Sequence, residues 1–176
     1  MVEDVVRVLG YSTLGSRLKR IGEKLQAQTQ GIGMHLAGAE LPASHNPVLA
    51  ALDRNGPLSI GHLAEAVGQS QPGVTRMVNS LKASGLVEGR QDVTDRRINR
   101  IALTNKGAAL VRQLQDTFWP RIMIAVKDAC SELEGSLLQQ LSQLEDALED
   151  VPLKKRCAKD DIPDWAALMK QMETDR

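Results

Sequence analysis

Five polar side chains between positions 70 and 79 have the chemistry of a surface that reads nucleic-acid bases. Arginine can pair with guanine, asparagine and glutamine can pair with adenine, and hydroxyl groups can bond to bases or phosphates. At helical spacing these side chains share one outward face; they are Ser70, Gln71, Thr75, Arg76 and Asn79. The ordinary alternative is a polar face that is merely solvated, as many exposed helix faces are.

The segment that follows concentrates arginine, at Arg90, Arg96, Arg97 and Arg100. Ile101 and Leu103 alternate there with Arg100 and Ala102, and residues 92–95 form a polar turn. This pattern predicts a short antiparallel hairpin with arginine at its tip. Arginine side chains on such a loop, a wing, can enter the minor groove of duplex DNA, where the potential is most negative.

Within the wing, Asp95 and Arg97 lie two residues apart, on the same side of an extended strand. A carboxylate at that distance can orient the guanidinium group through a bidentate pair. The alternative is a solvated surface ion pair that adds little to stability. The neighbouring helices favour the first interpretation, in which the pair serves contact with DNA.

Two short helices joined by a tight turn are predicted to present the first set of side chains. Ser59 is a good N-cap for a helix from Ile60 to Val67, which Gly68 closes. Ser70 caps the next helix, and Ser84-Gly85 ends it. The reading side chains therefore lie on the second helix of the pair.

A steep crossing between two such helices makes specific steric demands. It needs a small residue at the contact, a turn residue that tolerates a left-handed conformation, and a branched apolar residue under the second helix. Ala64, Gly68 and Val74 meet these demands in order. The pair is therefore predicted to be a helix-turn-helix, and its small core is completed by Ile60, Leu63, Val67, Val78 and Leu81.

Apolar residues at helical spacing predict further helices on both sides of this motif. The expected ranges are Leu14 to about Gly31-Ile32-Gly33, Pro47 to Arg54, a long helix after the cap Thr104, and a leucine seam from Leu137 to Val151. Val48, Leu49 and Leu52 are expected to be buried, and Pro120 is expected to kink or interrupt the long helix. A last short helix from about Pro163 would carry Trp165, Leu168 and Met172.

The composition limits the class of protein. A chain of 176 residues with 42% apolar and 25% charged residues is long enough for one folded domain with an arm. No stretch approaches the roughly 18 consecutive apolar residues of a membrane span, and the start, Met1 to Asp4, lacks the pattern of a secretory signal. Two cysteines cannot form a disulfide scaffold. We therefore expect a cytoplasmic protein without a membrane partner.

The formal net charge of zero conceals a strong asymmetry along the chain. Residues 70–112 hold eight basic and three acidic residues, a net charge of +5. Residues 131–176 hold six basic and eleven acidic residues, a net charge of −5. The basic excess coincides with the predicted reading helix and wing, so the neutral total does not argue against a nucleic-acid partner.

These motifs, in this order, resemble the MarR family of bacterial winged-helix transcription regulators. The resemblance covers about 14–151. It is carried by Ser59 to Ala64, Ser70 to Val78, Leu81 to Val87, Asp95-Arg96-Arg97 and Leu103 to Gly107. The resemblance implies a mainly α fold with a small β-hairpin wing, in which a winged helix-turn-helix domain is joined to a helical dimerisation domain. One departure is Gly73, where relatives often have a hydroxyl-bearing residue or alanine.

The resemblance also implies a function. A homodimeric, sequence-specific DNA-binding regulator is expected, most simply a repressor that a small effector releases from an inverted-repeat operator. Carried over by position, Ser70, Gln71, Thr75 and Arg76 would be recognition-helix contacts, and Asp95 and Arg97 the wing pair. Asn79 on the same helix face and Arg90 and Arg96 on the wing complete the predicted set of DNA contacts. No cofactor and no metal are expected. The ligand-binding residues are not assigned, although apolar or small anionic effectors are favoured because few aromatic rings are available to line a cleft.

The domain organisation follows from the same comparison. Residues 1–38 are expected to form an N-terminal dimerisation region, 39–103 the DNA-binding domain and 104–151 the C-terminal dimerisation helices. Residues 152–176 extend beyond these helices, and the apolar spacing of Trp165, Leu168 and Met172 favours an arm that covers a partner subunit.

Three alternatives stay open at this point. A winged helix that acts through protein contacts would show no salt-dependent affinity for DNA. A thiol-responsive regulator would use Cys130 or Cys157, of which the latter follows a basic Lys-Lys-Arg run. A metal-responsive regulator would need His35, His45 and His62 to converge with a carboxylate, which their spacing does not indicate. No enzyme motif is present, so an enzyme is not expected.

Overall fold

The computed structural model describes residues 2–37, 42–91, 99–157 and 164–174, with the side chains of 33–37 and 172–174 left aside. The chain divides into two compact units. The winged-helix unit is Glu23–Ala125, and the terminal unit combines Met1–Gly22 with Val126–Arg176. Within the described ranges no helix is long and apolar enough to cross a membrane.

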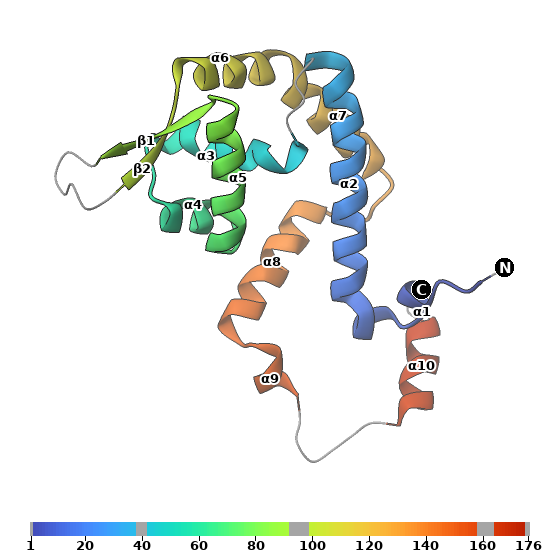
Figure 1. Ribbon diagram of the computed structural model, residues 1–176. Helices are drawn as coiled ribbons and strands as arrows, with labels where there is room; N and C mark the ends of the chain where they lie inside the picture. Colours follow the sequence, from blue (N-terminus) through green and yellow to red (C-terminus); the bar gives the residue numbers. More distant parts are fainter. Residues whose placement is uncertain (1, 38–41, 92–98, 158–163, 175–176) are drawn as a thin grey trace. The chain divides into compact units, whose positions relative to one another are not determined.

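The fold is mainly helical with one two-stranded antiparallel hairpin, which confirms the predicted fold class (Figure 1). The helices before the hairpin are α1 (Val5–Val8), α2 (Leu14–Ala37), α3 (Asn46–Asn55), α4 (Ile60–Val67) and α5 (Gln71–Ala83). The hairpin is β1 (Val87–Gln91) and β2 (Asn99–Leu103). After it come α6 (Asn105–Gln113), α7 (Trp119–Ala129), α8 (Leu137–Asp150), α9 (Leu153–Arg156) and α10 (Trp165–Thr174).

The core of the winged-helix unit is mostly aliphatic, in keeping with the low aromatic content of the chain. The side chains that are almost completely buried come from α3, α4, α5, β2 and α6; they include Val48, Leu49, Leu63, Val74, Val78, Leu81, Ile101 and Val111. Phe118 and Leu114 close the cluster, and Trp119 packs against it partly exposed. Three successive short helices therefore share one core with the hairpin and α6.

The hairpin receives a third backbone segment that the alternation pattern did not predict. Leu58 lies just before α4 and exchanges two backbone hydrogen bonds with Ile101, at 3.0 and 2.7 Å. Ala102 was expected on the polar face of β2, but it is as buried as Ile101. The strand is bordered by β1 on one side and by Leu58 on the other, so the simple alternation of buried and exposed residues does not hold along it.

A close approach joins the base of the hairpin to α6. A Cβ atom on Gly107 would lie 2.0 Å from the carbonyl oxygen of Leu86, so only glycine fits at this position. Thr104 caps α6 by accepting a hydrogen bond from the Gly107 N–H at 3.0 Å, and it donates to the Gly85 carbonyl at 2.7 Å. Lys106 adds a bond from Nζ to the Ser84 carbonyl at the end of α5, at 2.9 Å.

The long helix after Thr104 is interrupted, as Pro120 predicted. A π-helical turn, Leu114–Phe118, separates α6 from α7. Proline has no N–H to complete the regular bonding of an α-helix and its ring crowds the preceding turn, which accounts for the irregular stretch just before it. Gln115, in this turn, donates a hydrogen bond to Asp53 of α3 at 2.8 Å.

Helix α2 is longer than predicted, because it continues through Gly31 and Gly33 to Ala37. Glycine inside a helix costs only about 1 kcal/mol relative to alanine, which neighbouring contacts can outweigh. Two such contacts flank Gly31. Gln30 accepts a hydrogen bond from the backbone N–H of Ala43, and Ile32 packs against the core of the winged-helix unit.

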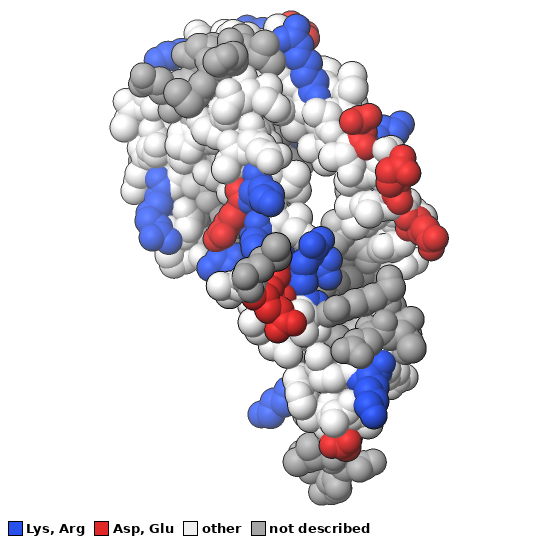
Figure 2. Space-filling view, turned by 90° about the vertical axis from the view of Figure 1, so that its right-hand side faces the viewer, with Lys and Arg blue, Asp and Glu red and all other residues white. Residues whose placement is uncertain are grey.

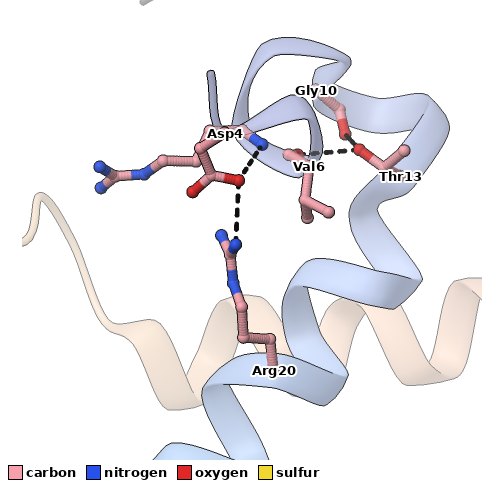
Figure 3. Close-up of polar contacts among 6 residues, drawn as sticks. Asp4, Val6, Gly10, Thr13 and Arg20 are labelled. Carbon is pink, nitrogen blue, oxygen red and sulfur yellow. Dashed lines mark hydrogen bonds and ion pairs between the residues drawn. The ribbon is translucent and has the colours of Figure 1, made fainter. Parts of the chain in front are cut away.

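In the terminal unit, the residues before α2 fold into a hook that was not predicted (Figure 3). Asp4 caps α1 by accepting from the Arg7 N–H at 3.3 Å, and it pairs with Arg20 of α2 at 2.9 Å. The hydrogen bond from Arg20 holds the pKa of Asp4 below its ordinary value. Thr13 donates to the Val6 carbonyl at 2.8 Å and so closes the hook.

The end of α8 also differs from the prediction. Val151 was placed inside the helix, but it adopts an extended conformation and the helix ends at Asp150. Pro152 explains the difference, because a residue that precedes proline is disfavoured in the helical region. Arg156, at the end of α9, then donates to the carbonyl groups of Val151 and Ala147, which ties α9 to the end of α8.

The last predicted helix is present as α10, which starts at Trp165 with a capping bond from the Ala167 N–H to Asp164. Pro163 and the Met172 side chain lie outside the described parts of the chain. Trp165 is 55% exposed and Leu168 is 37% exposed. The four-residue helix α9 was not predicted.

One buried titratable group lies in the winged-helix unit, at the N-cap position of α3. His45 is 8% exposed, and its Nε2 atom has no hydrogen-bond partner among the described residues. Burial lowers the pKa of His45, and a backbone hydrogen bond with Pro42 acts in the opposite direction. A buried neutral imidazole therefore contributes to the core at this helix start.

The approach at Gly107 predicts that Gly107→Ala destabilises the protein by about 3 kcal/mol, because a methyl group would force α6 away from Leu86. Thermal unfolding should show a fall in melting temperature of roughly 5–10 °C. The matched control is Gly31→Ala in α2, where a Cβ meets nothing within 4 Å and helix propensity improves. An unchanged melting temperature for Gly107→Ala would contradict this account.

The burial of His45 predicts a pH-dependent stability. The unfolded chain binds a proton near the ordinary histidine pKa of about 6.5, whereas the folded chain binds it only at lower pH. The free energy of unfolding should therefore be highest above that value and fall as the pH decreases through it, by at most about 1.4 kcal/mol per pH unit.

The measurement is chemical denaturation at pH 7.5 and pH 5.5. His45→Gln should lose much of the difference between the two, whereas His62→Gln, at an exposed position of α4, should keep it. Equal pH dependence in the wild type and the His45→Gln variant would refute the assignment.

Candidate nucleic-acid interface

Helix α5 gathers the five predicted reading residues on one exposed side. Ser70, Gln71, Thr75, Arg76 and Asn79 are all exposed, whereas Val74, Val78 and Leu81 of the same helix are buried. The helix forms where it does because Ser70 caps it, accepting from the Gly73 N–H at 3.3 Å, and Pro72 lies in the first turn. The burial of one stripe leaves the polar stripe facing outward.

The turn before α5 has the left-handed geometry that the predicted helix-turn-helix requires. Gly68 adopts a left-handed conformation, with φ 62° and ψ 34°, at the end of α4. The N–H of Gln69 donates to the Ala64 carbonyl at 3.0 Å, and Ala64 itself is buried. The predicted helix-turn-helix of α4 and α5 is therefore present, with the capping residues in the expected places.

Hydrogen bonds within the chain determine whether the hydroxyl groups of Ser70 and Thr75 can act as donors or as acceptors toward a bound molecule. Thr75 donates its hydroxyl proton to the Gln71 carbonyl at 2.8 Å, so it presents a methyl group and acceptor lone pairs. Ser70 accepts in its capping bond and so keeps its hydroxyl proton for an external acceptor. Ser70 is thus suited to a phosphate oxygen, and Thr75 to a thymine methyl group or a base amino group.

The Gln71 side chain reaches over the first turn of α4. A Cβ built on Gly61 would lie 3.7 Å from Gln71 Nε2, in ordinary van der Waals contact. Alanine at position 61 would therefore fit beside this amide. Gly73 is more crowded, because a Cβ there would lie 3.2 Å from the capping oxygen of Ser70. Alanine at position 73 would therefore press on the cap.

The described part of the wing is its stem. Arg90 of β1 is exposed and lies opposite Arg100 of β2 in the ladder. Arg90 Nε donates to Glu88 Oε1 at 2.7 Å, and Arg100 donates to the Pro57 carbonyl at 3.5 Å. Asp95, Arg96 and Arg97 lie outside the described residues, so the Asp95–Arg97 pair stays a prediction.

Sequence reasoning missed the ion pair between Glu88 and Arg90, although the signal was present. The two residues are two apart on a predicted strand, the same spacing that suggested the pair of Asp95 and Arg97. It also missed Lys106, whose bond to the end of α5 helps to position the reading helix.

The face of the molecule drawn in Figure 2 shows lysine and arginine among aspartate and glutamate, so both signs of charge are exposed there.

The residues of the other candidate chemistries can be located in the described part of the chain. No group of three or more histidine, cysteine, aspartate or glutamate side chains that could hold a metal ion occurs there. Cys130 is half-buried just after α7, and Cys157 is exposed just after α9. His45 and His62 lie on different elements, at the start of α3 and in the first turn of α4.

Comparison with known proteins points to one family. A family model described as MarR family matches residues 40–98. The transcriptional repressor MprA of Escherichia coli strain K12 is 29% identical over 90 residues, which is 47% of this chain and 51% of that protein. The chain thus spans about half the length of this curated relative.

Two solved structures illustrate the likeness of fold. The PcaV transcriptional regulator from Streptomyces coelicolor, in complex with its natural ligand, is 20% identical with a TM-score of 0.62, over 86% of this chain and 98% of that one. The MepR–DNA complex of S. aureus is 20% identical with a TM-score of 0.60, over 80% and 96%. At this level of identity the likeness establishes the fold.

Proposed function

We propose that the chain is a cytoplasmic, sequence-specific DNA-binding transcription regulator, most simply a repressor, because residues 40–98 match a family model described as MarR family. The observation that carries the proposal is the exposed polar stripe of α5, held over a tight helix-turn-helix by the Ser70 cap and by Gly68. A regulator of this class has no enzymatic activity of its own. In this proposal, residues 39–103 of the chain form the DNA-binding domain.

In the proposed binding mode, α5 enters the major groove and the wing enters the adjacent minor groove. Arg76 and Asn79 have the side chains that pair with guanine and adenine, and Ser70 has a free hydroxyl proton for a phosphate. The wing contributes Arg90 from its stem and Asp95, Arg96 and Arg97 from its tip. The MepR structure, solved with DNA, supports a DNA complex for this fold.

We further propose a homodimer in which residues 1–38 and 104–151 supply the interface. Many large apolar side chains outside the winged-helix core are exposed in the single chain, and such surface is normally covered by a partner. On α2 and α8 they are Leu18, Ile21, Leu25, Leu138 and Leu148. The arm 152–176, with Trp165 and Leu168 exposed, would cover the second copy. Two symmetric half-sites about one helical turn apart, or a multiple, would then form the operator.

We also propose that a small effector lowers the affinity for DNA. The support is indirect: PcaV was solved in complex with its natural ligand and shares this fold. The core near α3 and α6 is mostly aliphatic, with Phe118 and Trp119 as aromatic members, which favours apolar or small anionic effectors. An effector of this kind would release the operator in the binding assay described next.

The reading surface is tested on DNA from upstream of the protein's own gene, with fluorescence anisotropy at moderate salt. Arg76→Ala and Arg97→Ala should each weaken operator binding by roughly 5- to 100-fold, the range of one lost base contact of about 1–3 kcal/mol. Affinity should also fall steeply with salt, because phosphate contacts release counterions.

The control is Arg112→Ala, which removes the same charge from an exposed position near the end of α6. It should bind the operator like the wild type. If Arg76→Ala and Arg97→Ala both bind as tightly as the control, the proposed reading surface is wrong. If the wild type shows no salt-dependent affinity at all, a winged helix that acts through protein contacts becomes the better interpretation.

The dimer is tested by light scattering after size exclusion. The wild type should have twice the chain mass of 19.2 kDa, and the double variant Leu18→Glu/Ile21→Glu should approach one chain mass. Both residues are exposed in the single chain, so a charge there should not unfold the monomer. Gln28→Glu, at an exposed polar position of α2, is the control and should stay dimeric. A monomeric wild type would rule out the homodimer.

A further inference from the structure

The stem of the wing carries a charge arrangement that the reading helix does not explain. Glu88 and Arg90 lie two residues apart on β1, and Arg90 lies opposite Arg100 on β2. Residues at these positions project from the same face of a two-stranded ladder. Among the residues that the structure describes, one face of the stem therefore presents the guanidinium groups of Arg90 and Arg100 beside the carboxylate of Glu88.

Directly opposed like charges destabilise a pair of strands, with Cβ atoms only about 5 Å apart. The structure shows how the two arginines avoid each other. Arg90 bonds to Glu88 on its own strand at 2.7 Å. Arg100 bonds at 3.5 Å to the carbonyl of Pro57, which precedes Leu58, the residue that pairs with β2 on the side away from β1. Each guanidinium group is thus drawn toward an acceptor away from the other.

The contact between Glu88 and Arg90 is incomplete. It uses only Arg90 Nε, and both side chains are about half exposed, at 56% for Arg90 and 47% for Glu88. A guanidinium group has five N–H donors, so the terminal nitrogens of Arg90 keep donors for a further anion. An exposed ion pair of this kind contributes little to stability, so its loss or rearrangement is cheap.

We propose that this face of the stem, formed by Arg90 and Arg100, is a contact site for the phosphodiester backbone of DNA, and that Glu88 opposes it as a built-in competing anion. The inference rests on the proposed DNA-binding function and extends it to Arg100 and Glu88. Phosphate contacts fix the position of a protein on the duplex and carry no sequence information of their own. The stem site therefore sets affinity, whereas α5 sets sequence preference.

Glu88 opposes binding in two ways. It occupies a donor of Arg90, and it places a negative charge within a few ångströms of the arriving phosphate. At about 5 Å in a water-like dielectric, that repulsion is of the order of the energy of one surface ion pair. Removing the charge of Glu88 should therefore strengthen DNA binding, and it should do so for any sequence.

The test compares two duplexes of equal length, the operator and an unrelated sequence, in fluorescence anisotropy titrations over a series of salt concentrations. Arg100→Ala should weaken binding to both duplexes by a similar factor, about 5-fold, and should reduce the salt slope by about 0.9 for one lost phosphate contact. Arg100→Lys keeps the charge and should recover most of the affinity. Glu88→Gln should strengthen binding to both duplexes by about two- to fivefold.

Two charge-matched controls complete the set. Arg112→Ala on α6 and Glu132→Gln in the turn after α7 are exposed and should change neither the affinity nor the salt slope. Thermal unfolding of each variant shows whether Arg100→Ala disturbs its contact with Pro57. If that variant fails to fold, the affinities of Arg100→Lys and Glu88→Gln for the two duplexes test the proposal in its place.

The outcomes separate this inference from the proposed function. If the wild type binds neither duplex, the DNA-binding function itself fails. If the wild type binds DNA but Arg100→Ala and Glu88→Gln match their controls, the stem site is wrong and the function stands. A loss confined to the operator would also overturn the proposal, because it would make Arg100 a base-reading residue.

Discussion

The winged-helix unit depends on a close approach between two backbone segments. The start of α6 meets the chain at Leu86, in the short link between α5 and β1, where position 107 has no room for a side chain. Thr104, Lys106 and Gly107 together bond to the carbonyl groups of this link or to each other. Because these contacts hold the end of α5 and the start of β1 at the same point, the reading helix and the wing are positioned by a single junction.

The electrostatic character of the interface follows from what this junction leaves exposed. Residues 70–112 carry the basic excess of a neutral chain, and the buried stripe of α5 turns the polar side chains outward. Hydrogen bonds within the chain make two similar hydroxyl groups differ. Ser70 keeps its hydroxyl proton for an external acceptor, whereas Thr75 donates its proton to the Gln71 carbonyl. In the proposed DNA complex, contact with phosphate and recognition of bases would thereby be divided among neighbouring residues of one surface.

Much of this fold could be predicted from the sequence where the signal is local. The caps Ser59, Ser70 and Thr104 mark helix starts, because a capping hydroxyl bonds to an N–H only three residues away. Pro120 marks the interruption of the long helix for an equally local reason. These features located the candidate reading face correctly on one exposed helix side.

Several of the features that escaped prediction are set by partners distant in the chain. Helix α2 passes Gly31 because Gln30 and Ile32 have partners elsewhere, and Ala102 is buried in a strand that Leu58 borders. The hook before α2 depends on Asp4 meeting Arg20. No periodicity in a single sequence records such contacts, whereas the pair of Glu88 and Arg90 was local and could have been found.

The pairing of Leu58 with Ile101 has a consequence for how the domain folds. These two residues close a loop of the chain that contains α4, α5 and β1 in full. Closing a long loop costs conformational entropy before the contacts that stabilise the loop have formed, so such pairings form slowly relative to helices. Helix α5 can form early from its own cap, but we expect it to reach its final orientation only when this loop closes. The surface that would meet DNA is then a product of a long-range step in folding.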